Sequence, residues 1–255
     1  MTWVESASRS FRARHDAGAV DDAERVLHSL EEAREQLAEY FTTPPAGLTV
    51  VLHGSGTSLS IASPVVPLAW VLTDPGARRY LVGWAGRHEL HMLAPDALER
   101  RASTVPGSQE MLALTAPALY ARRVIEESNG DLRRRSGSGR RVAELRWAWM
   151  LEGAARWFSG QTEHSRHAIA RRLREGPRPG FPPGARDALL LGGTVIDLLA
   201  REQGEAAAAR FVCRLDPRGP RKALAGAFDG RPMARTEEAW RSSLTRLAGA
   251  SYASS

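Results

Sequence analysis

The segment from Trp147 to Phe158 constrains the fold more than any other part of the chain. It contains three tryptophans and a phenylalanine around a single carboxylate, Glu152, which Gly153 follows. Because large aromatic side chains are costly to leave in water, this segment must be mostly buried. A carboxylate in such surroundings is expensive unless it is paired, hydrogen-bonded or bound to a metal. The pattern therefore predicts a core helix, from Val142 to Phe158, in which Glu152 needs a partner.

The composition is that of an ordinary globular protein. The chain has 255 residues, of which 43% are hydrophobic and 25% charged, enough for one large domain or two small ones. Its formal net charge is +6, but Lys222 is the only lysine among 35 basic residues, which indicates a biased codon composition. A basic balance permits contact with nucleic acid or an anionic membrane. A solvated, arginine-rich surface is the simpler interpretation, so nucleic acid is not expected as a partner.

The cysteine content and the apolar runs bear on the cellular compartment. The single cysteine, Cys213, excludes an internal disulfide and a metal site built from several cysteines. The first residues, Met1 to Ser6, lack a basic segment followed by an apolar one, so no signal peptide is visible. No apolar run approaches the roughly 20 residues of a membrane span. We therefore expect a cytoplasmic location and no membrane span, and the oligomeric state stays open.

The first half of the chain alternates strand and helix patterns. Ser8 to His15 has the period of a strand, Ala19 to Phe41 has the spacing of a long amphipathic helix, and Leu48 to His53 is a nearly continuous apolar strand. Residues 58–75 contain Pro64, Pro67 and Pro75, so we expect a loop with short elements there.

A hairpin is predicted next along the chain. Two strand-like segments, Tyr80 to Ala85 and His88 to Ala94, flank Gly86-Arg87. Two turn residues with glycine first are typical of a type II′ turn. The hairpin should form an antiparallel edge of the sheet.

The second half reads as mostly helical. Pro117 should either kink the helix from Glu110 to Ser128 or mark its first turn. Asp131 to Arg141 is polar and punctuated by glycine and serine, which favours a loop. The remaining predicted helices are Val142–Phe158, Glu163–Arg174, Ala185–Glu202, Glu205–Leu215, Arg218–Phe228 and Thr236–Leu247. The expected fold class is α+β, with an α/β part at 1–107 and a helical part at 108–255 forming one compact unit.

Two histidine pairs in the sequence resemble zinc-binding motifs, but neither has the required spacing or ligands. His88-Glu89-Leu90-His91 has its histidines three apart in a segment of period 2, where they point to opposite faces, whereas the zinc motif needs a spacing of four on a helix. His164 and His167 could share a helical face, but no third ligand is identifiable. We interpret both pairs as ordinary strand and surface residues.

The order of these elements, together with Trp149-Met150-Leu151-Glu152-Gly153-Ala154-Ala155, resembles the gluzincin group of zinc metallopeptidases. The chain is most similar to the small peptidase-MA-like domains, whose fold is zincin-like. Those domains have a strand, a long helix, a strand and a glycine-containing antiparallel hairpin. A helix with His-Glu-x-x-His and a helix with Trp-x-x-Glu-Gly-x-Ala follow, and a Trp-Arg pair, here Trp240-Arg241, lies near the end. The resemblance covers Ser8 to Leu247.

The resemblance places Glu152 at the position of the third zinc ligand. The two histidines and the general-base glutamate would come from the preceding helix, where Thr115, Ala116 and Leu119 stand instead. None of these side chains can hold zinc or accept a proton from a metal-bound water. The oxyanion-stabilising tyrosine of the later helix has no counterpart in Ala185 to Glu202. The resemblance therefore implies a zincin scaffold whose zinc site is lost, with no metal, no cofactor and no catalytic residue.

This favours a catalytically inactive, metallopeptidase-like domain that works as a protein- or peptide-binding or scaffolding module through the former zinc cleft. In active relatives the edge strand pairs with an extended peptide, and strand addition needs only backbone hydrogen bonds. The cleft should lie between the hairpin strand His88 to Ala94 and the two helices that contain Thr115 and Glu152. The candidate binding residues are Glu152, Trp149, Thr115, Leu119, Arg156 and Trp84.

Two alternatives stay open. The first is an enzyme with new chemistry in the same pocket, in which burial raises the pKa of Glu152 so that it acts as acid or base. An arginine partner for Glu152, from Arg122, Arg123 or Arg156, would favour the structural role, and an unpaired Glu152 near a histidine would favour the enzyme. The second alternative is an anionic partner bound by the arginine-rich segment Arg133–Arg141.

Overall fold

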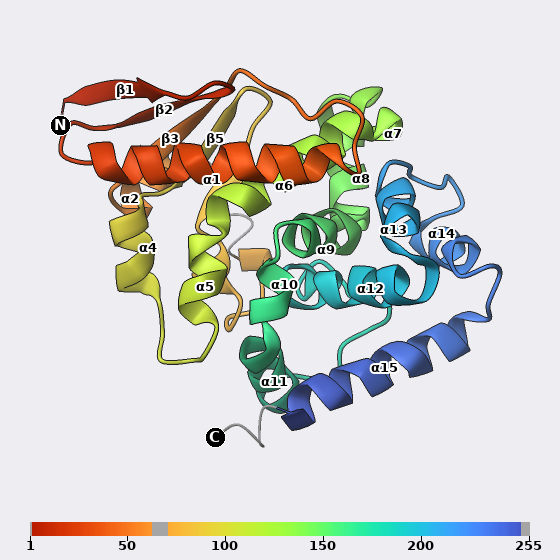
Figure 1. Cartoon of the computed structure of the whole chain (residues 1–255). Coiled ribbons are helices and arrows are strands. Elements are labelled where there is room, and N and C mark those ends of the chain that lie inside the picture. Colours follow the sequence, from red (N-terminus) through yellow and green to blue (C-terminus); the bar gives the residue numbers. More distant parts are fainter. Residues whose placement is uncertain (1, 63–70, 251–255) are drawn as a thin grey trace.

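The chain folds around a five-stranded mixed sheet in this computed structural model, which describes residues 2–62 and 71–250 (Figure 1). The strand order is β1-β2-β3-β5-β4. β2 and β3 run parallel, as do β3 and β5, whereas β1 and β4 are antiparallel to their neighbours. The strands are β1 Trp3–Ala7, β2 Phe11–Asp16, β3 Leu48–His53, β4 Gly83–Ala85 and β5 Glu89–Leu93.

One face of the sheet is covered by a long helix, α1 (Val20–Ala38), which joins the parallel strands β2 and β3 as a crossover connection. The alternation of β2 explains this face, because Phe11 and Ala13 are buried there while Arg12 is exposed. All six residues of β3 are buried, as expected for a central strand. The prediction missed β1, whose residues alternate between exposed and half-buried and so carry no apolar signal.

The predicted hairpin exists, but its turn lies one residue further along. Trp84 pairs with His91 and Ala85 with Leu90, and the Gly86 N–H donates to the Glu89 carbonyl over 2.8 Å. Arg87 and His88 therefore occupy the turn, and Gly86 does not have a positive φ, so the type II′ prediction was wrong. This register buries Leu90 completely, and a slip of one residue would turn that side chain to the other face.

Short helices precede and follow the hairpin. They are α2 Gly56–Ala62, the 3₁₀ turn η1 Arg78–Tyr80, and α4 Pro95–Arg101. The loop predicted for residues 58–75 is thus partly helical at its start. Pro64 and Pro67 lie outside the described residues.

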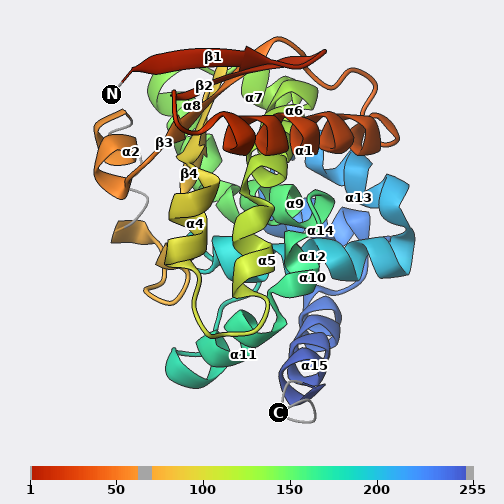
Figure 2. The same ribbon diagram turned by 60° about the vertical axis from the view of Figure 1, so that its left-hand side comes forward.

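The rest of the chain is helical, so the fold class is α+β as predicted (Figure 2). Pro117 stands in the first turn of α6 (Thr115–Ser128), one of the two placements expected for it, because α5 (Ser108–Ala113) ends just before. The other helices are α7 Gly130–Arg133, α8 Gly137–Arg146, α9 Ala148–Phe158, α10 Gln161–His164, α11 Arg166–Glu175, α12 Ala188–Gln203, α13 Glu205–Val212, α14 Pro220–Ala227 and α15 Met233–Ala250.

Three helix predictions need correction. The polar segment from Asp131 to Arg141 is not a loop but contributes to α7 and α8, and the Asn129 side chain caps α7 by accepting from the Leu132 N–H over 3.1 Å. The helix expected from Val142 to Phe158 breaks at Trp147. The helix expected from Glu163 breaks at Ser165, so His164 and His167 lie on different helices.

The aromatic helix α9 is a core helix, as its composition requires. Trp149, Met150 and Leu151 are all buried. A Cβ atom on Gly153 would clash with the backbone of Gly192 in α12, so glycine permits the two helices to approach closely. One continuous hydrophobic core runs from the sheet through α9 and α12 to α15. Among the described helices, none is long and apolar enough to cross a bilayer.

Candidate functional site

A cleft of about 990 Å³ lies between the hairpin edge and the helices α6 to α9, where the resemblance predicts a binding cleft. Its wall includes five of the six candidate residues: Thr115, Leu119, Glu152, Arg156 and Trp84. On one side stand η1, β4 and the turn that follows. On the other stand one face of α6, the arginine-rich part of α7 and α8, and the exposed face of α9.

Helix α6 presents one stripe of side chains to the cleft. Thr115, Leu119, Arg122 and Glu126 follow each other at intervals of three or four, the spacing of one helical face. The Thr115 hydroxyl donates to the Leu112 carbonyl over 2.5 Å, and so it is already used within the backbone. Leu119 packs against β4, since a Cβ atom on Gly83 would lie 2.6 Å from Leu119 Cδ1. The two positions expected for zinc-binding histidines thus hold an occupied hydroxyl and an apolar contact.

Ala116 lies on a different side of α6 from these two residues. It lines a separate cavity of about 230 Å³ together with Leu98 and Leu112. The position that the resemblance assigns to the general base therefore does not face the main cleft.

Trp149 is part of the core and not of the cleft, which corrects its choice as a candidate. Its residue surface is only 2% exposed, and its ring lies 6.1 Å from that of Phe211 in α13. Its backbone carbonyl borders Gly192 at the close crossing of α9 and α12. The residue is one turn before Glu152, and at that position the helix faces α12 and α13.

Glu152 pairs with Arg122, one of the three arginines that the sequence offered for this role. Arg122 Nε lies 3.2 Å from Glu152 Oε1, and the same guanidinium lies 3.0 Å from Glu126 Oε1. The Glu152 side chain is 36% exposed, so the sequence overstated its burial. The tryptophans of α9 face the core while Glu152 lies at the edge of that face, open to the cleft.

The other two candidate arginines have different partners. Arg123 donates from Nε to the Arg87 carbonyl over 3.0 Å and forms an ion pair with Glu127. Arg156 is buried and donates from Nη1 to the side-chain oxygen of Gln161, whose amide in turn donates to the Met111 carbonyl. Gln161 was not singled out from the sequence, because a lone glutamine after a helix carries no spacing signal.

Arg122 and Arg156 differ in how well the protein compensates their charge. Burial acts to lower the pKa of both guanidinium groups. For Arg122 the carboxylates of Glu126 and Glu152 outweigh burial, and the pKa is raised. For Arg156 the more distant charge of Glu152 does not offset burial, and the pKa is lowered. Arg122 Nη1 and Arg156 Nε also lack a hydrogen-bond acceptor among the described residues.

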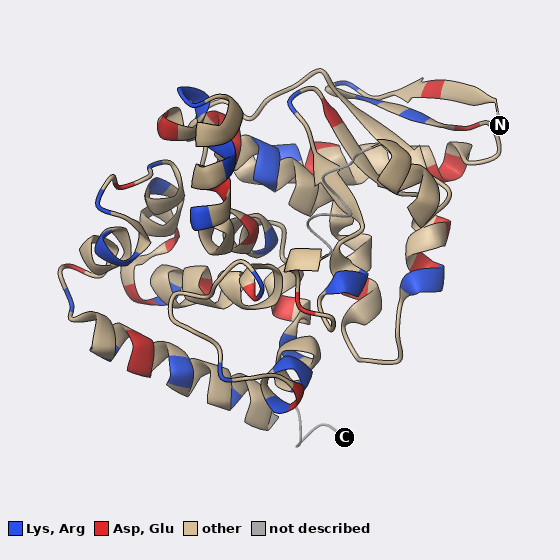
Figure 3. Ribbon diagram, turned by 180° about the vertical axis from the view of Figure 1, so that it is seen from behind, with Lys and Arg blue, Asp and Glu red and all other residues tan. Residues whose placement is uncertain are grey.

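The arginine-rich segment borders the same cleft. Arg133, Arg134, Arg135 and Arg140 all line it. Arg140 joins the segment to α6 through Glu126 Oε2 at 2.9 Å, and it also lies 2.7 Å from Glu144. Figure 3 shows basic and acidic stretches alternating over α6, α7, α8 and α9. Two candidate sites that the sequence kept apart are therefore one site, and helical spacing from Leu119 to Glu126 was the signal that could have joined them.

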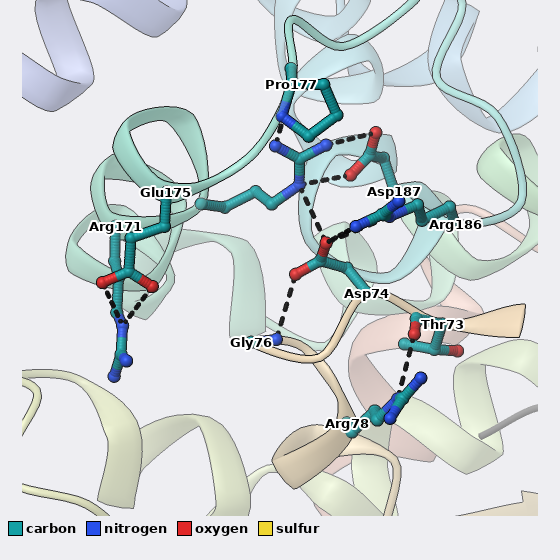
Figure 4. A network of polar contacts seen from close by, with 10 residues as sticks. Thr73, Asp74, Gly76, Arg78, Arg171, Glu175, Pro177, Arg186 and Asp187 are labelled. Atoms are coloured by element: carbon teal, nitrogen blue, oxygen red, sulfur yellow. Dashed lines mark hydrogen bonds and ion pairs between the residues drawn. The ribbon is translucent and has the colours of Figure 1, made fainter. Parts of the chain in front are cut away.

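A different arginine network lies outside this cleft, between α11, the segment before η1 and the start of α12 (Figure 4). Arg172 forms a two-pronged ion pair with Asp187, with N–O distances of 2.7 and 3.0 Å. Its Nη1 donates to the Pro177 carbonyl over 3.0 Å, and Asp74 lies 3.4 Å from Nε. Arg186 approaches the same Asp74 carboxylate to 3.0 Å. All three nitrogens of the Arg172 guanidinium are thus satisfied by the protein.

Of the two histidines in the motif, only His91 belongs to β5, and it lies on the same face of the sheet as its cross-strand partner Trp84. His91 is buried and lies 3.1 Å from His53 Nε2, while its own Nε2 lies 3.2 Å from Glu89. His88 is exposed in the turn. Among the described residues, no group of three His, Cys, Asp or Glu side chains is arranged to hold a metal ion.

No protein family, curated protein or solved structure matches the chain. The gluzincin resemblance therefore stays a prediction that rests on the order of elements and on the motif around Glu152.

Proposed function

We propose that the chain is a zincin-like domain without zinc ligands, whose cleft binds an extended peptide along β4. The observation that carries this proposal is that β4 is an edge strand of the sheet formed by the described residues. The strand ends the sheet on the side that faces the cleft, across from Thr115, Leu119 and Glu152. The arrangement agrees with what the resemblance implies for a substrate cleft.

The hydrogen-bond pattern of the hairpin defines which groups are free. The Leu93 N–H donates to the Val82 carbonyl over 3.0 Å, and Gly86 donates to Glu89 at the turn. Because antiparallel pairs alternate, the intervening N–H and C=O groups of Gly83 and Ala85 point away from β5. Within the described residues, no other group hydrogen-bonds to them. An extended peptide can therefore add to β4 through backbone hydrogen bonds.

The side chains at the former ligand positions favour binding without hydrolysis. Zinc sites use thiolate, imidazole and carboxylate ligands, and catalysis by zinc requires a bound water whose pKa the metal lowers. Leu119 offers no donor, and the Thr115 hydroxyl is held by a backbone carbonyl. Glu152 is the single carboxylate at these positions, and it faces Arg122.

An enzyme with new chemistry at Glu152 is less well supported. That hypothesis needs a carboxylate free to take or give a proton, with a histidine nearby. Instead Arg122 holds Glu152, and the residues that line the cleft include no described histidine. The ion pair favours a structural role for Glu152.

Peptide binding can be tested by panning a library of random linear dodecapeptides against the full chain. We expect enriched peptides whose binding the substitution Ala85→Pro abolishes, because proline removes the outward N–H of the edge strand. Ala85→Val, which keeps that N–H, is the matched control. The proposal is wrong if no peptide is enriched, or if enriched peptides bind both variants equally.

The loss of the zinc site has its own test. The protein is equilibrated with zinc at neutral pH, and bound metal and hydrolysis of the panned peptides are measured. We expect neither stoichiometric tight zinc nor cleavage. Tight zinc together with peptidase activity would contradict the proposal.

A further inference from the structure

The walls of the cleft carry twice as many arginines as carboxylates. Eight arginines line it, namely Arg87, Arg122, Arg123, Arg133, Arg134, Arg135, Arg140 and Arg156. The acidic side chains are four, Glu126, Glu127, Glu144 and Glu152. Lysine, aspartate and histidine are absent from the described lining. The excess positive charge faces a concave, partly enclosed space, where low-dielectric walls strengthen its field.

The carboxylates of the cleft are already engaged. Glu126 is shared by Arg122 and Arg140, at 3.0 and 2.9 Å. Glu127 is shared by Arg123 and Arg133, at 2.5 and 3.7 Å.

The remaining lining arginines divide into paired and unpaired groups. Arg134 pairs with Asp131 at 2.6 Å. Arg87, Arg135 and Arg156 have no carboxylate partner within the described part of the chain. The positive excess is therefore not a matter of counting alone, since three specific guanidinium groups form no direct ion pair within the described residues.

Arg156 is the most informative of these three, because it is buried. A buried guanidinium normally needs a carboxylate and hydrogen bonds for all of its N–H groups. Arg156 instead has one neutral partner, Gln161, and an Nε without an acceptor. Exposed arginines such as Arg87 and Arg135 can be solvated by water, but Arg156, at 9% exposure, can be only partly solvated. Because Arg156 lines the cleft, its guanidinium is placed where a charge from outside the chain can reach it.

We propose that the peptide bound along β4 carries a carboxylate, and that this group supplies the missing counter-charge at Arg156. The carboxylate belongs to an acidic side chain or to the C-terminus of the peptide, and Arg87 and Arg135 at the rim attract it. This inference rests on the proposed peptide binding and names the class of peptide. Arginine suits the role, because its planar guanidinium recognises carboxylates through paired hydrogen bonds.

The test uses the full chain and the panned peptides, each also made with every Asp and Glu replaced by its amide and with an amidated C-terminus. We expect loss of the recognised carboxylate to weaken binding at least tenfold, measured by fluorescence anisotropy. Arg156→Met should weaken binding of the acidic peptide by a similar factor and leave the amide peptide unaffected. Arg171→Met is the matched control, because it removes one positive charge from an exposed position outside the cleft, and it should change neither affinity.

The outcomes separate this inference from the function on which it rests. If Ala85→Pro abolishes peptide binding but neither the amide peptides nor Arg156→Met changes the affinity, edge binding stands and the carboxylate inference is wrong. If no peptide binds in an Ala85-dependent way, the proposed peptide binding itself is wrong.

A competition experiment identifies the source of the anion. If free succinate or inorganic phosphate displaces the peptide at concentrations near the dissociation constant of the peptide, the anion is a small molecule and not part of a peptide. Should Arg156→Met fail to fold, Arg156→Lys and the peptide comparison still decide the matter.

Discussion

The two arginine networks of this protein differ in how completely the chain itself satisfies them. Arg172 is almost fully buried, and each nitrogen of its guanidinium has a protein acceptor in Asp187, Asp74 or Pro177 (Figure 4). In the cleft, Arg122 Nη1 and Arg156 Nε have no described acceptor, although both atoms are buried. Both regions contain buried arginines near carboxylates. They differ in whether every guanidinium nitrogen has an acceptor within the described residues.

The difference indicates what each network is for. Arg172 joins α11 to Asp74, before η1, and to Asp187 at the start of α12, three segments that are distant in sequence. Such a closed network positions parts of the fold. The cleft network keeps Arg156 buried without an ion pair, which destabilises the free protein, and the proposed peptide carboxylate would supply the missing charge. Stability measurements on the two networks should therefore give opposite results.

The largest effect is expected for Arg172→Leu. The substitution leaves Asp187 buried without its counter-charge, and breaking a buried pair in this way costs about 3–5 kcal/mol. Chemical denaturation followed by tryptophan fluorescence measures the free energy of unfolding. Replacing Asp187 by leucine in the same chain should recover part of the loss, whereas Arg171→Leu on the neighbouring exposed position should cost little. A loss below about 1 kcal/mol for Arg172→Leu would show that the closed network does not stabilise the fold.

A change of pH should act on a third cluster, around the buried His53. Burial, and to a lesser degree the charge of His91, lowers the pKa of His53 from its ordinary 6.5 to about 4. Below pH 6.5 the unfolded chain binds a proton that the folded chain refuses until about pH 4. The stabilisation is therefore complete above pH 6.5 and is lost as the pH falls toward 4, on the order of 3 kcal/mol in total.

Unfolding titrations between pH 7.5 and 4 can isolate this contribution. His53→Gln should flatten the slope, because the glutamine does not titrate. His28→Gln, at an exposed position on α1, should leave the slope unchanged. An unaltered slope in His53→Gln would assign the pH dependence to other groups.

Arg156→Met should have a much smaller effect on stability than Arg172→Leu. Burial lowers the pKa of the Arg156 guanidinium, so removing this buried charge favours the folded state. The substitution also leaves the Gln161 side-chain oxygen without its hydrogen-bond donor, which costs about 1 kcal/mol. We expect the free energy of unfolding to stay within about 1 kcal/mol of the parent chain or to rise. The same denaturation assay measures it. A loss of 3 kcal/mol or more would place Arg156 with Arg172 as a structural residue and remove the argument for an external counter-charge.

The sequence predicted the fold where one side-chain pattern dominated. The alternation of β2, the apolar run of β3 and the spacing of α1 were enough, because each buries a face that the pattern already marks. The sequence did not predict β1, because its exposed and half-buried residues carry no apolar pattern, or the turn at Arg87, because the burial of Leu90 sets the register of the hairpin. The helices α7 and α8 were missed because tertiary packing and the Asn129 cap override a polar, glycine-rich composition.

For the site, the sequence offered five residues that line one cleft and named Arg122 among three possible arginine partners of Glu152, but it did not show the charge balance. Glu152 looked buried because its neighbours are aromatic, yet those neighbours face α12 and α13 while Glu152 faces the cleft. Composition alone could not show that Arg156 and the arginines after Leu132 border one space. That juxtaposition depends on how α8 and α9 pack on α6, which no local pattern specifies.

The smallest effect on stability is expected for Glu152→Gln. This substitution also separates the hypothesis of a peptide-binding cleft from that of an active site in which Glu152 is an acid or base. The ion pair with Arg122 is about one-third exposed on the glutamate side, and Arg122 keeps Glu126, so the loss should be about 0.5 kcal/mol and should vanish at 1 M salt. Removing a negative charge beside Arg156 should strengthen binding of an acidic peptide about twofold or more, which anisotropy titrations at low salt can measure. Glu152→Asp, which keeps the charge, is the matched control and should not strengthen binding. If Glu152 were instead an acid or base, Glu152→Gln would abolish turnover of a substrate without tightening peptide binding, and the cleft would be an active site.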